Sequence, residues 1–476
     1  MAGTILERQL TVARTGRVRF DVGCQSDDAE IRRLLRDNPM PGRISLSLER
    51  EPNCFADADL PGETKRTVVA RDGGRLVCVG CCTIRQHYVN GAPRRVGYLG
   101  GLRLDARYAG RFDILRRGYE FFRELQAEAP ADFYFTSIAR DNERARKLLE
   151  YGLPGMPLYD FIGDFVTVLF PVHGRNRAKE ALDSNQRLLT CEWAHLVTAT
   201  KLQRTPSRNA AFMRQIWARR RLLPNESGVP VAKCTPCVLP KYAKREKQAW
   251  DGSQLLSNSS KTEHSSLAAA EDGRTPGVGQ HAVTPTAANE LVSCLNESNR
   301  AYQFAPCWSS DELIALSSLG LQMDDFCVVR SRQRLAACAA LWDQRNFKQT
   351  VIRGYAPWVG FARPIFNSFA RITNRPQLPV VGETLAKGYV SHLAAGTEET
   401  GTLIALLTEL RSVAARRGIE LLTLGFDARD PRLAMVRKNF RCREYRSRLY
   451  VVRWPGIGGA AGELDDRCLG PEVALL

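Results

Sequence analysis

The sequence predicts a mixed α/β fold that occurs twice along the chain. Three observations support this prediction: a length of 476 residues, a composition that is 44% hydrophobic, and a pattern of strands and amphipathic helices that recurs on both sides of a polar segment. One hydrophobic core rarely grows beyond about 250–300 residues. A chain of this length is therefore expected to form two domains.

The polar segment marks the expected boundary between the domains. Large aliphatic residues are few between residues 229 and 286, where stretches such as Asp272–Gly279 are polar and rich in glycine. Such a composition does not offset the entropy lost on ordering, which favours a flexible linker. We predict domains at residues 15–172 and 287–454, a helical junction at 173–228, the linker at 229–286 and a disordered tail at 455–476.

Two short segments on either side of this linker match each other. Val69–Leu76 corresponds to Val328–Leu335, in register at Arg71/Arg330, Arg75/Arg334 and Leu76/Leu335. Each segment predicts a strand, a tight turn and a second strand, that is, a β-hairpin. Gly97-Tyr98 and Gly354-Tyr355 follow the two hairpins at similar distances, so we expect them to be equivalent.

A strand followed by a short helix also recurs. Phe133–Asn142 and Leu421–Asp430 are both apolar segments that reach Ala-Arg-Asp just before a helix. Asn142 is a suitable N-cap and Gly152 a suitable stop for the first helix, while Pro431 suits the first turn of the second. Longer helices precede both strands, at Arg111–Glu128 and around Leu403–Val413, and their apolar residues recur every three or four positions, which predicts packing against a sheet.

Composition limits the class of protein. The first 20 residues lack the apolar run of a secretory signal, and the apolar stretch Phe161–Val172 is too short to span a membrane. The 14 cysteines, several of them in apolar strands, are typical of reduced thiols in a cytoplasmic protein. The formal charge of +17 favours anionic partners, which include nucleic acid, a lipid surface and coenzyme A. Aromatic residues are not interleaved with the basic run Arg219–Arg221, so nucleic acid is the less favoured partner.

The order hairpin, long strand, helix, strand, short helix, strand, found twice, resembles the GCN5-related N-acetyltransferase (GNAT) superfamily in tandem form. Arg95–Arg111 resembles the family's fourth strand running into its pyrophosphate loop. The resemblance covers about residues 15–172 and, more weakly, 290–454. It implies two GNAT-like mixed-sheet domains of the acyl-CoA N-acyltransferase fold, with acetyl-CoA or another acyl-CoA as co-substrate.

The resemblance also implies a cofactor site in the first copy. In that family the fourth strand parts from the fifth and its backbone binds the pantetheine arm, while the next helix directs its N-terminus at the pyrophosphate. The loop departs from the family pattern Arg/Gln-x-x-Gly-x-Gly/Ala, because Phe112 stands at the last small position. The residues that the resemblance assigns to the cofactor are Leu102, Arg103, Leu104, Gly110, Arg111, Phe112 and Asn142.

The implied reaction is direct attack of a neutral amine on an acyl thioester, which needs a base for the amine and a proton for the thiolate. Asp105, at the mouth of the expected cleft, and Glu63 are candidates for the base, although both are also typical of solvated surface acids. The family's general-acid tyrosine falls at Leu149 here. Tyr151 is therefore the candidate acid, although it lies about 200° further round the helix, and a packed aromatic is the alternative.

The remaining signals concern metals and the second copy. Cys234 and Cys237 form only half a zinc knuckle, so we predict no metal. In the second copy the strand Lys387–Leu393 leads to two glutamates, Glu398 and Glu399, where an anion would have to bind. We therefore expect this copy to be a structural or substrate-shaping partner. Its apolar segment Ala356–Glu383 predicts a helix packed on the domain, with a lid over a substrate cleft as the alternative.

These observations favour an N-acyltransferase that moves an acyl group, expected to be acetyl, from coenzyme A to an amine of a small molecule or peptide. The alternative is a non-catalytic acyl-CoA-binding or scaffold protein with tandem GNAT-like domains. Neither the acceptor nor the oligomeric state is indicated by the sequence.

Overall fold

Both halves of the chain contribute strands to one large sheet. The computed structural model describes residues 18–173, 191–193, 285–331, 334–373, 377–396 and 400–476. These residues belong to one unit, formed by residues 1–196 and 282–476. Arg219–Arg221, Cys234, Cys237 and nearly all of the expected junction and linker lie outside the described residues.

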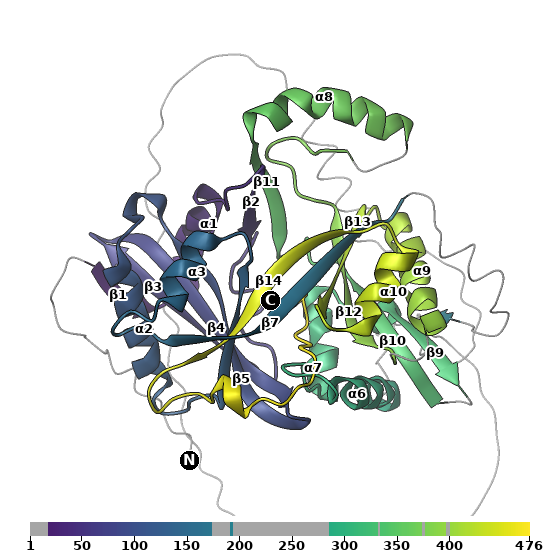
Figure 1. Ribbon diagram of the computed structural model, residues 1–476, viewed down its shortest axis with the longest axis horizontal. Helices are drawn as coiled ribbons and strands as arrows, with labels where there is room; N and C mark the ends of the chain where they lie inside the picture. Colours follow the sequence, from purple (N-terminus) through teal and green to yellow (C-terminus); the bar gives the residue numbers. More distant parts are fainter. Residues whose placement is uncertain (1–17, 174–190, 194–284, 332–333, 374–376, 397–399) are drawn as a thin grey trace, which may run out of the picture. The chain divides into compact units, whose positions relative to one another are not determined.

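The first half contains the elements of the predicted repeat in order (Figure 1). They are β1 (Val18–Val22), α1 (Asp28–Asp37), β2 (Ile44–Glu49), β3 (Thr64–Asp72), β4 (Arg75–Val89), β5 (Ala92–Leu104), α2 (Phe112–Gln126), β6 (Phe133–Ala139), α3 (Glu143–Glu150) and β7 (Leu158–Pro171), followed by the short β8 (Cys191–Trp193).

The second half repeats that order with additions at its start and middle. Its elements are α6 (Pro285–Asn299), α7 (Ser310–Ala315), β9 (Phe326–Ser331), β10 (Arg334–Trp342), β11 (Gln349–Tyr355), α8 (Pro357–Ile372), β12 (Lys387–Ala394), α9 (Thr400–Arg416), β13 (Leu421–Asp427), α10 (Pro431–Asn439) and β14 (Arg443–Arg453).

Local sequence sets several element boundaries as expected. Gly73 and Gly74 form the β3–β4 turn with φ of 58° and 85°, a region that glycine enters without strain. The side chain of Asn142 accepts a hydrogen bond from the backbone of Ala145 and begins α3, and Gly152, with φ of 68°, follows its end. Pro431 opens α10. The predicted hairpin, caps and stop are confirmed.

The last strands of the two halves are exchanged within the sheet. The sheet runs β1-β3-β4-β5-β6-β14-β7-β13-β12-β10-β9-β8. β14, from the second half, pairs antiparallel with β6, with Ser447 opposite Ala139. β7, from the first half, pairs antiparallel with β13, with Leu421 opposite Pro171. The two predicted domains therefore share a single sheet.

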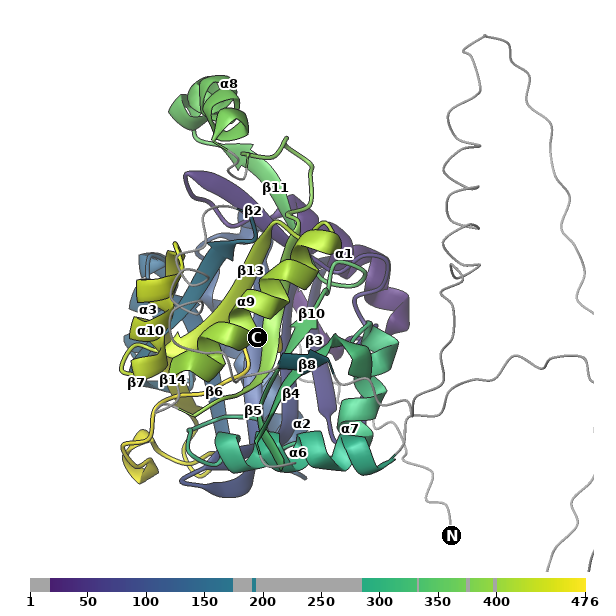
Figure 2. The same cartoon turned by 90° about the vertical axis from the view of Figure 1, so that its right-hand side faces the viewer.

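Helices cover both faces of this sheet. Figure 2 shows α3 and α10 on one side of it and α1 and α7 on the other. The α9 stripe predicted from Leu403, Leu407 and Val413 is buried against the sheet, which confirms it. α2 buries Phe122 but leaves Phe112, its first residue, 49% exposed. Among the described residues, no helix is long and apolar enough to cross a membrane.

The expected equivalence of Gly97-Tyr98 and Gly354-Tyr355 is wrong. Gly354 lies on β11, which pairs only with β2 in a separate two-stranded ribbon. The structural counterpart is Gly388-Tyr389 on β12, because β5 and β12 occupy matching places in the two halves and pair in the same way with β6 and β13. The sequence comparison matched the wrong pair because an extra segment is inserted between β10 and β12, which places Gly354-Tyr355 at the distance from the hairpin where Gly388-Tyr389 was expected.

Two further expectations fail. Residues 455–476 are not disordered: Leu469 and Ala474 are buried, and the segment packs against strands of both halves. Apolar residues spread singly through Ile457, Leu464 and Leu469 gave no periodic signal in the sequence. The helix predicted within Ala356–Glu383 is present as α8, but its apolar residues are exposed instead of packed.

Candidate active site

The first half contains a V-shaped gap between neighbouring parallel strands. β5 and β6 pair only at Val96–Phe133, Gly97–Tyr134 and Tyr98–Phe135. Beyond this point the hydroxyl of Thr136 donates a hydrogen bond to the carbonyl of Leu99 at 2.7 Å, and no described strand is in register with Leu99–Leu104 on that side. A strand edge without a partner is suited to bind an extended chain that carries amide groups.

Two glycines, Gly97 and Gly101, shape β5 where it parts from β6. A Cβ on Gly97 would come within 2.6 Å of the Tyr134 ring, so only glycine lets the strands approach there. Gly101 has φ of 65° and lies in a bulge, where Gly101 and Leu102 stand opposite Gly80 of β4. The bulge bends β5 at the place where the ladder to β6 has ended.

The three β5 residues that the sequence assigns to the cofactor lie along this open edge. Leu102 is 42% exposed, and Leu104 packs beside the buried Ile114 of α2. Burial lowers the pKa of Arg103, and its Nε is buried without a hydrogen-bond partner among the described residues. A half-buried cation with unused donor capacity next to an unpaired strand edge fits an anionic or carbonyl-bearing ligand.

Asp105 closes the end of β5 in a structural role. It is 6% exposed, and its carboxylate accepts hydrogen bonds from the backbone of Arg107 at 3.1 Å and from the Arg107 guanidinium at 2.7 Å. The hydrogen bonds from Arg107 lower the pKa of Asp105 to about 2. A carboxylate held in this way is a cap for the following turn and a weak proton acceptor.

The start of α2 carries a paired charge. Gly110 has φ of 93°, and a Cβ there would meet no atom within 4 Å. The Arg111 guanidinium binds both carboxylate oxygens of Asp113 at 2.8 Å. Phe112 is the first helical residue and is half exposed. An anion at this helix start would therefore have to draw Arg111 away from Asp113, and the assignment of these residues to a pyrophosphate stays a prediction.

The two residues singled out near α3 lie at its opposite ends. The side-chain oxygen of Asn142 caps the helix by accepting a hydrogen bond from the Ala145 backbone nitrogen at 3.2 Å. Tyr151 is the C-cap residue and is 78% exposed. Such exposure differs from the packed aromatic considered as the alternative, and it leaves the phenol in water.

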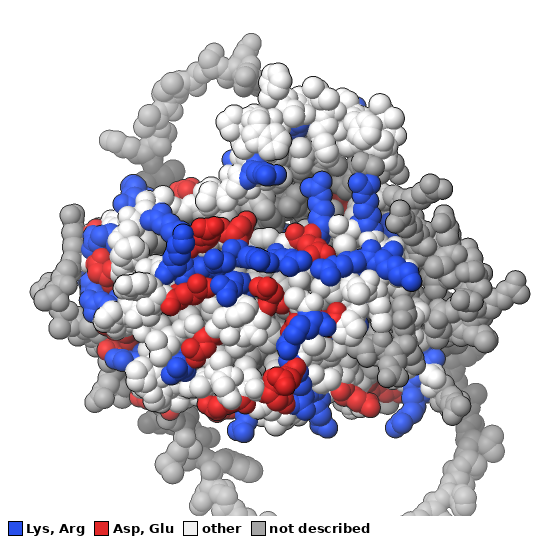
Figure 3. All heavy atoms as spheres, viewed as in Figure 1, with Lys and Arg blue, Asp and Glu red and all other residues white. Residues whose placement is uncertain are grey.

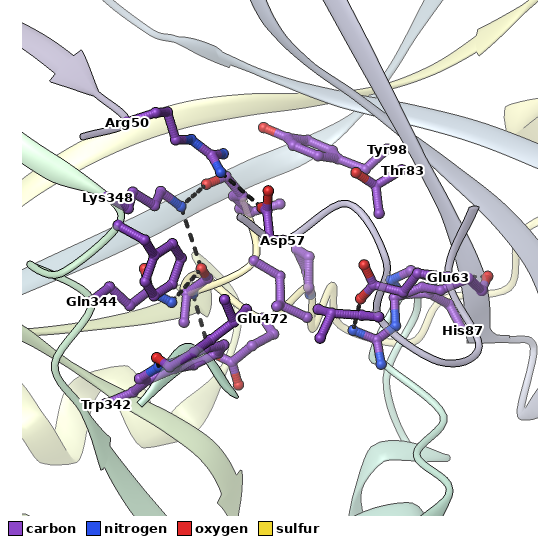
Figure 4. A pocket seen from close by; sticks show the side chains of 18 of the residues that line it. Arg50, Asp57, Glu63, Thr83, His87, Tyr98, Trp342, Gln344, Lys348 and Glu472 are labelled. Carbon is purple, nitrogen blue, oxygen red and sulfur yellow. Dashed lines mark hydrogen bonds and ion pairs between the residues drawn. The ribbon is translucent and has the colours of Figure 1, made fainter. Parts of the chain in front are cut away.

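A pocket opens at the base of the V (Figure 4). It encloses about 630 Å³, part of it open to solvent. Tyr98 and Phe135, the last paired residues of β5 and β6, both line it. The other walls come from distant parts of the chain and include Arg50, Asp57, Glu63, Thr83, Arg85, His87, Trp342, Gln344, Lys348 and Glu472.

Two acids that line this pocket, Glu63 and Glu472, have pKa values raised by burial, and Glu472 already accepts hydrogen bonds from the backbone of His392 and Ala474. Burial raises the pKa of Glu63, and Asp57 adds to the increase, while Arg85 opposes it through an ion pair of 2.9 Å. Gly62, with φ of 72°, precedes it, and a Cβ there would collide with the Glu312 carboxylate. Glycine at this position is therefore needed to bring Glu63 to the pocket wall.

A second ionic cluster, around Asp57, also lines the pocket. Arg50 and Lys65 both pair with Asp57, and although burial raises the pKa of Asp57, these cations outweigh it and hold the pKa well below its usual range. Burial lowers the pKa of Lys348 to about 8, and its ammonium donates to the carbonyl of Ala474 at 3.3 Å. The pocket thus presents charges of both signs to a ligand.

Tyr98 was not recognised as a site residue from the sequence. Its hydroxyl lies 3.3 Å from the hydroxyl of Ser137, and burial raises the pKa of Tyr98 to about 12, so that it keeps its proton. The available signal was the Gly-Tyr pair itself, which recurs at 388–389. Lys348 gave no signal, because it reaches the pocket only through the fold of the second half.

The second half has the same gap, which leaves a space of about 520 Å³, part of it open to solvent. β12 and β13 pair only from Lys387 to Tyr389, and beyond this point residues 469–473 line the space between Leu393 and the end of β13. The backbone N–H of His392 donates to Glu472 at 2.8 Å, and that of Leu469 donates to Asp427 at 2.7 Å. Glu398 and Glu399, predicted to repel an anion here, lie outside the described residues.

Cationic side chains also run across the face that carries β14 (Figure 3). Several are paired with acids: Arg446 with Glu444 at 3.4 Å, and Arg448 with Glu150 at 2.8 Å. Nucleic-acid-binding surfaces leave such cations free for phosphates. The described part of this face therefore gives little support to nucleic-acid binding.

Together the gap, the bulge and the repeated element order define a tandem GNAT-like fold, as the sequence predicts. No family model and no curated protein matches this chain. Among solved structures it is similar to N-myristoyltransferase of Saccharomyces cerevisiae with bound myristoyl-CoA (9% identity, 97% of this chain and 90% of that chain covered, TM-score 0.48). It is also similar to GCN5-related N-acetyltransferases from Sphaerobacter thermophilus (12%, 94% and 99%, 0.42) and Kribbella flavida (9%, 91% and 70%, 0.38). These values concern overall shape and carry no conclusion about the reaction.

Proposed function

We propose that this protein is an N-acyltransferase that takes an acyl group from coenzyme A and transfers it to an amine. The observation that carries the proposal is the junction of two features: the β5–β6 ladder stops at Tyr98 and Phe135, and these same side chains line the charged pocket. The open β5 edge suits the amide-bearing arm of the donor, and the pocket suits the acceptor.

The thioester supplies an activated carbonyl, and the protein supplies position and proton transfer. Glu63 accepts the proton that the amine loses as its nitrogen bonds to the carbonyl carbon, since a raised pKa makes this carboxylate a better base than Asp105. Tyr98 donates its proton as the carbon–sulfur bond breaks, so that the thiol leaves neutral. We propose acetyl as the acyl group.

The decisive experiment measures thiol release from a series of acyl-CoA thioesters with a panel of amines. Glu63→Gln is expected to lower kcat/KM by about 10²–10⁴-fold, the usual contribution of a general base. In the unaltered protein, activity should fall as the pH drops through a pKa above the ordinary 4.5 of a glutamate, and Glu63→Gln should lose this acidic limb.

Glu312→Gln is the matched control. Glu312 also faces Arg85, at 3.6 Å, but it serves as the capping-box residue of α7, a position that glutamine fills as well. Its pH profile should keep the acidic limb, shifted to lower pH, because the charge of Glu312 contributes to the raised pKa of Glu63. Binding of acyl-CoA without turnover of any amine would instead support the acyl-CoA-binding or scaffold alternative, for which the paired Arg111 and the capping role of Asp105 are the favouring observations.

A further inference from the structure

α8 stands away from the pocket and from the main sheet. β11 pairs with β2 from Gln349–Glu49 to Tyr355–Ile44, and α8 begins two residues after β11 ends. Figure 1 shows α8 lying across the end of this ribbon, and Figure 2 shows it nearly end-on in the same place. No residue of α8 lines the pocket, so the lid considered from the sequence is not formed here.

One side of α8 exposes a stripe of large apolar side chains. Trp358, Phe361, Ile365 and Ile372 are 62%, 84%, 73% and 85% exposed. At 3.6 residues per turn these four lie within about 60° of one another around the helix axis. Only Val359 and Ala370 of this helix are buried. Exposed apolar stripes of this size are uncommon on proteins without a binding partner.

The surroundings of the stripe add positive charge. The segment from 356 to 382 contains no aspartate or glutamate, whereas Arg371 lies on the helix. The Arg43 guanidinium lies 5.9 Å from the centre of the Trp358 ring. The stripe is therefore bordered by cations.

We infer that α8 docks the protein on an anionic lipid surface, with the helix axis in the plane of the interface. Trp and Phe on the apolar side, with arginines at the border, are typical of helices that insert between headgroups and acyl chains. Sixteen residues of helix reach about 24 Å, less than the roughly 30 Å of a hydrocarbon core, so α8 lies on the surface and does not cross it.

Charge favours lipid over a second copy of this chain. The formal charge is +17, and pairing two α8 stripes would bring two basic molecules and their border arginines together. Anionic headgroups instead attract both the arginines and the molecule as a whole. The inference is independent of the proposed acyl transfer, because it uses no residue of the pocket.

The test is sedimentation of the full chain with phosphatidylcholine vesicles, with and without phosphatidylserine. The protein should bind the vesicles that contain phosphatidylserine. Phe361→Ser/Ile365→Ser/Ile372→Ser should weaken binding by about tenfold or more, because three side chains no longer leave water. Arg371→Glu should weaken binding only to the anionic vesicles, and added salt should do the same.

Val22→Ser, at a residue of β1 that is 44% exposed, is the matched control and should bind like the unaltered protein. Lipids brominated on their acyl chains should quench part of the tryptophan emission, and Trp358→Phe should abolish that part. The three replaced side chains are more than two-thirds exposed, so far-ultraviolet circular dichroism should be unchanged.

Equal vesicle binding by the triple variant, or no binding to anionic vesicles, overturns the inference. A concentration-dependent dimer that the triple variant abolishes also overturns it, in favour of a second copy as the occupant of the stripe.

Discussion

The two V-shaped gaps have the same framework and different contents. In both halves the parallel ladder stops at the tyrosine of a Gly-Tyr pair, and in both a bulge follows, at Gly101 in the first half and His392 in the second. The second gap is lined by residues 469–473 of the same chain, and Glu472 already accepts the N–H of His392. The two halves therefore share the arrangement of their strands but not a binding site, because a ligand along the second gap would have to displace internal hydrogen bonds.

The largest expected effect separates Tyr98 from its counterpart Tyr389. Tyr98→Phe should lower kcat by about 10²-fold if its hydroxyl protonates the leaving thiolate, while Tyr389→Phe should change kcat less than about twofold. The Tyr389 hydroxyl accepts a hydrogen bond from Lys387 at 2.9 Å, and Tyr389 is not among the residues that line the pocket. Single-turnover kinetics of both variants would measure the rate of the acyl-transfer step.

Tyr151→Phe belongs in the same series, since Tyr151 was the candidate acid from the sequence. Its 78% exposure predicts an effect within about twofold. A large loss of kcat in Tyr151→Phe combined with none in Tyr98→Phe would place the reacting thiolate beside α3 and contradict the proposal that Tyr98 is the general acid.

The second effect tests whether the segment that lines the second gap is integral to the fold. Leu469 is 3% exposed and packs in a cluster with Phe165 and Phe304. Leu469→Ala should lower the free energy of unfolding by about 2–5 kcal/mol, the range for a buried leucine. Val381→Ala, at a residue 56% exposed, should stay within about 0.5 kcal/mol. Urea titration measures both, and equal values would mean that the segment only rests on the surface.

The smallest effect concerns Asp105, the cap at the open end of the first gap. Asp105→Asn should lower stability near neutral pH by about 1 kcal/mol, as for loss of a capping carboxylate. Its pKa of about 2 in the folded protein lies below the ordinary 3.8, so the stabilisation is present above 3.8 and disappears as the pH falls toward 2. Unfolding curves at several pH values should therefore converge in acid, and a variant that instead loses the acidic limb of activity would return Asp105 to the role of base.

The sequence predicted the elements more successfully than the site. Local sequence patterns predict the hairpins and the Asn142 cap. The order of the elements carries the resemblance that implies the parting of β5 from β6. The pocket brings together Tyr98, Lys348 and Glu472, which are far apart in the chain and carry no shared pattern. Glu63 was recognised as a candidate, but only burial near Arg85 distinguishes it from a surface acid.

The failures have physical causes of the same kind. Apolar residues in α8 predicted packing, yet periodicity reports only that a helix has an apolar side and not what covers it. The segment 455–476 lacks any period because it follows an irregular path between two halves, where each apolar residue meets a different cavity. Composition alone could not distinguish such a path from disorder.

The exchange of β7 and β14 has a consequence for how the chain is made. Ala139 of β6 faces Ser447 of β14, so the contact joins residues 447 − 139 = 308 positions apart. At roughly 5–20 residues per second, a ribosome needs about 15–60 s to deliver the missing strand. During that interval the β6 edge is an open template for pairing with other nascent chains. We therefore expect the first half, expressed by itself, to aggregate or to depend on a chaperone, and a stable monomer of that fragment would contradict this.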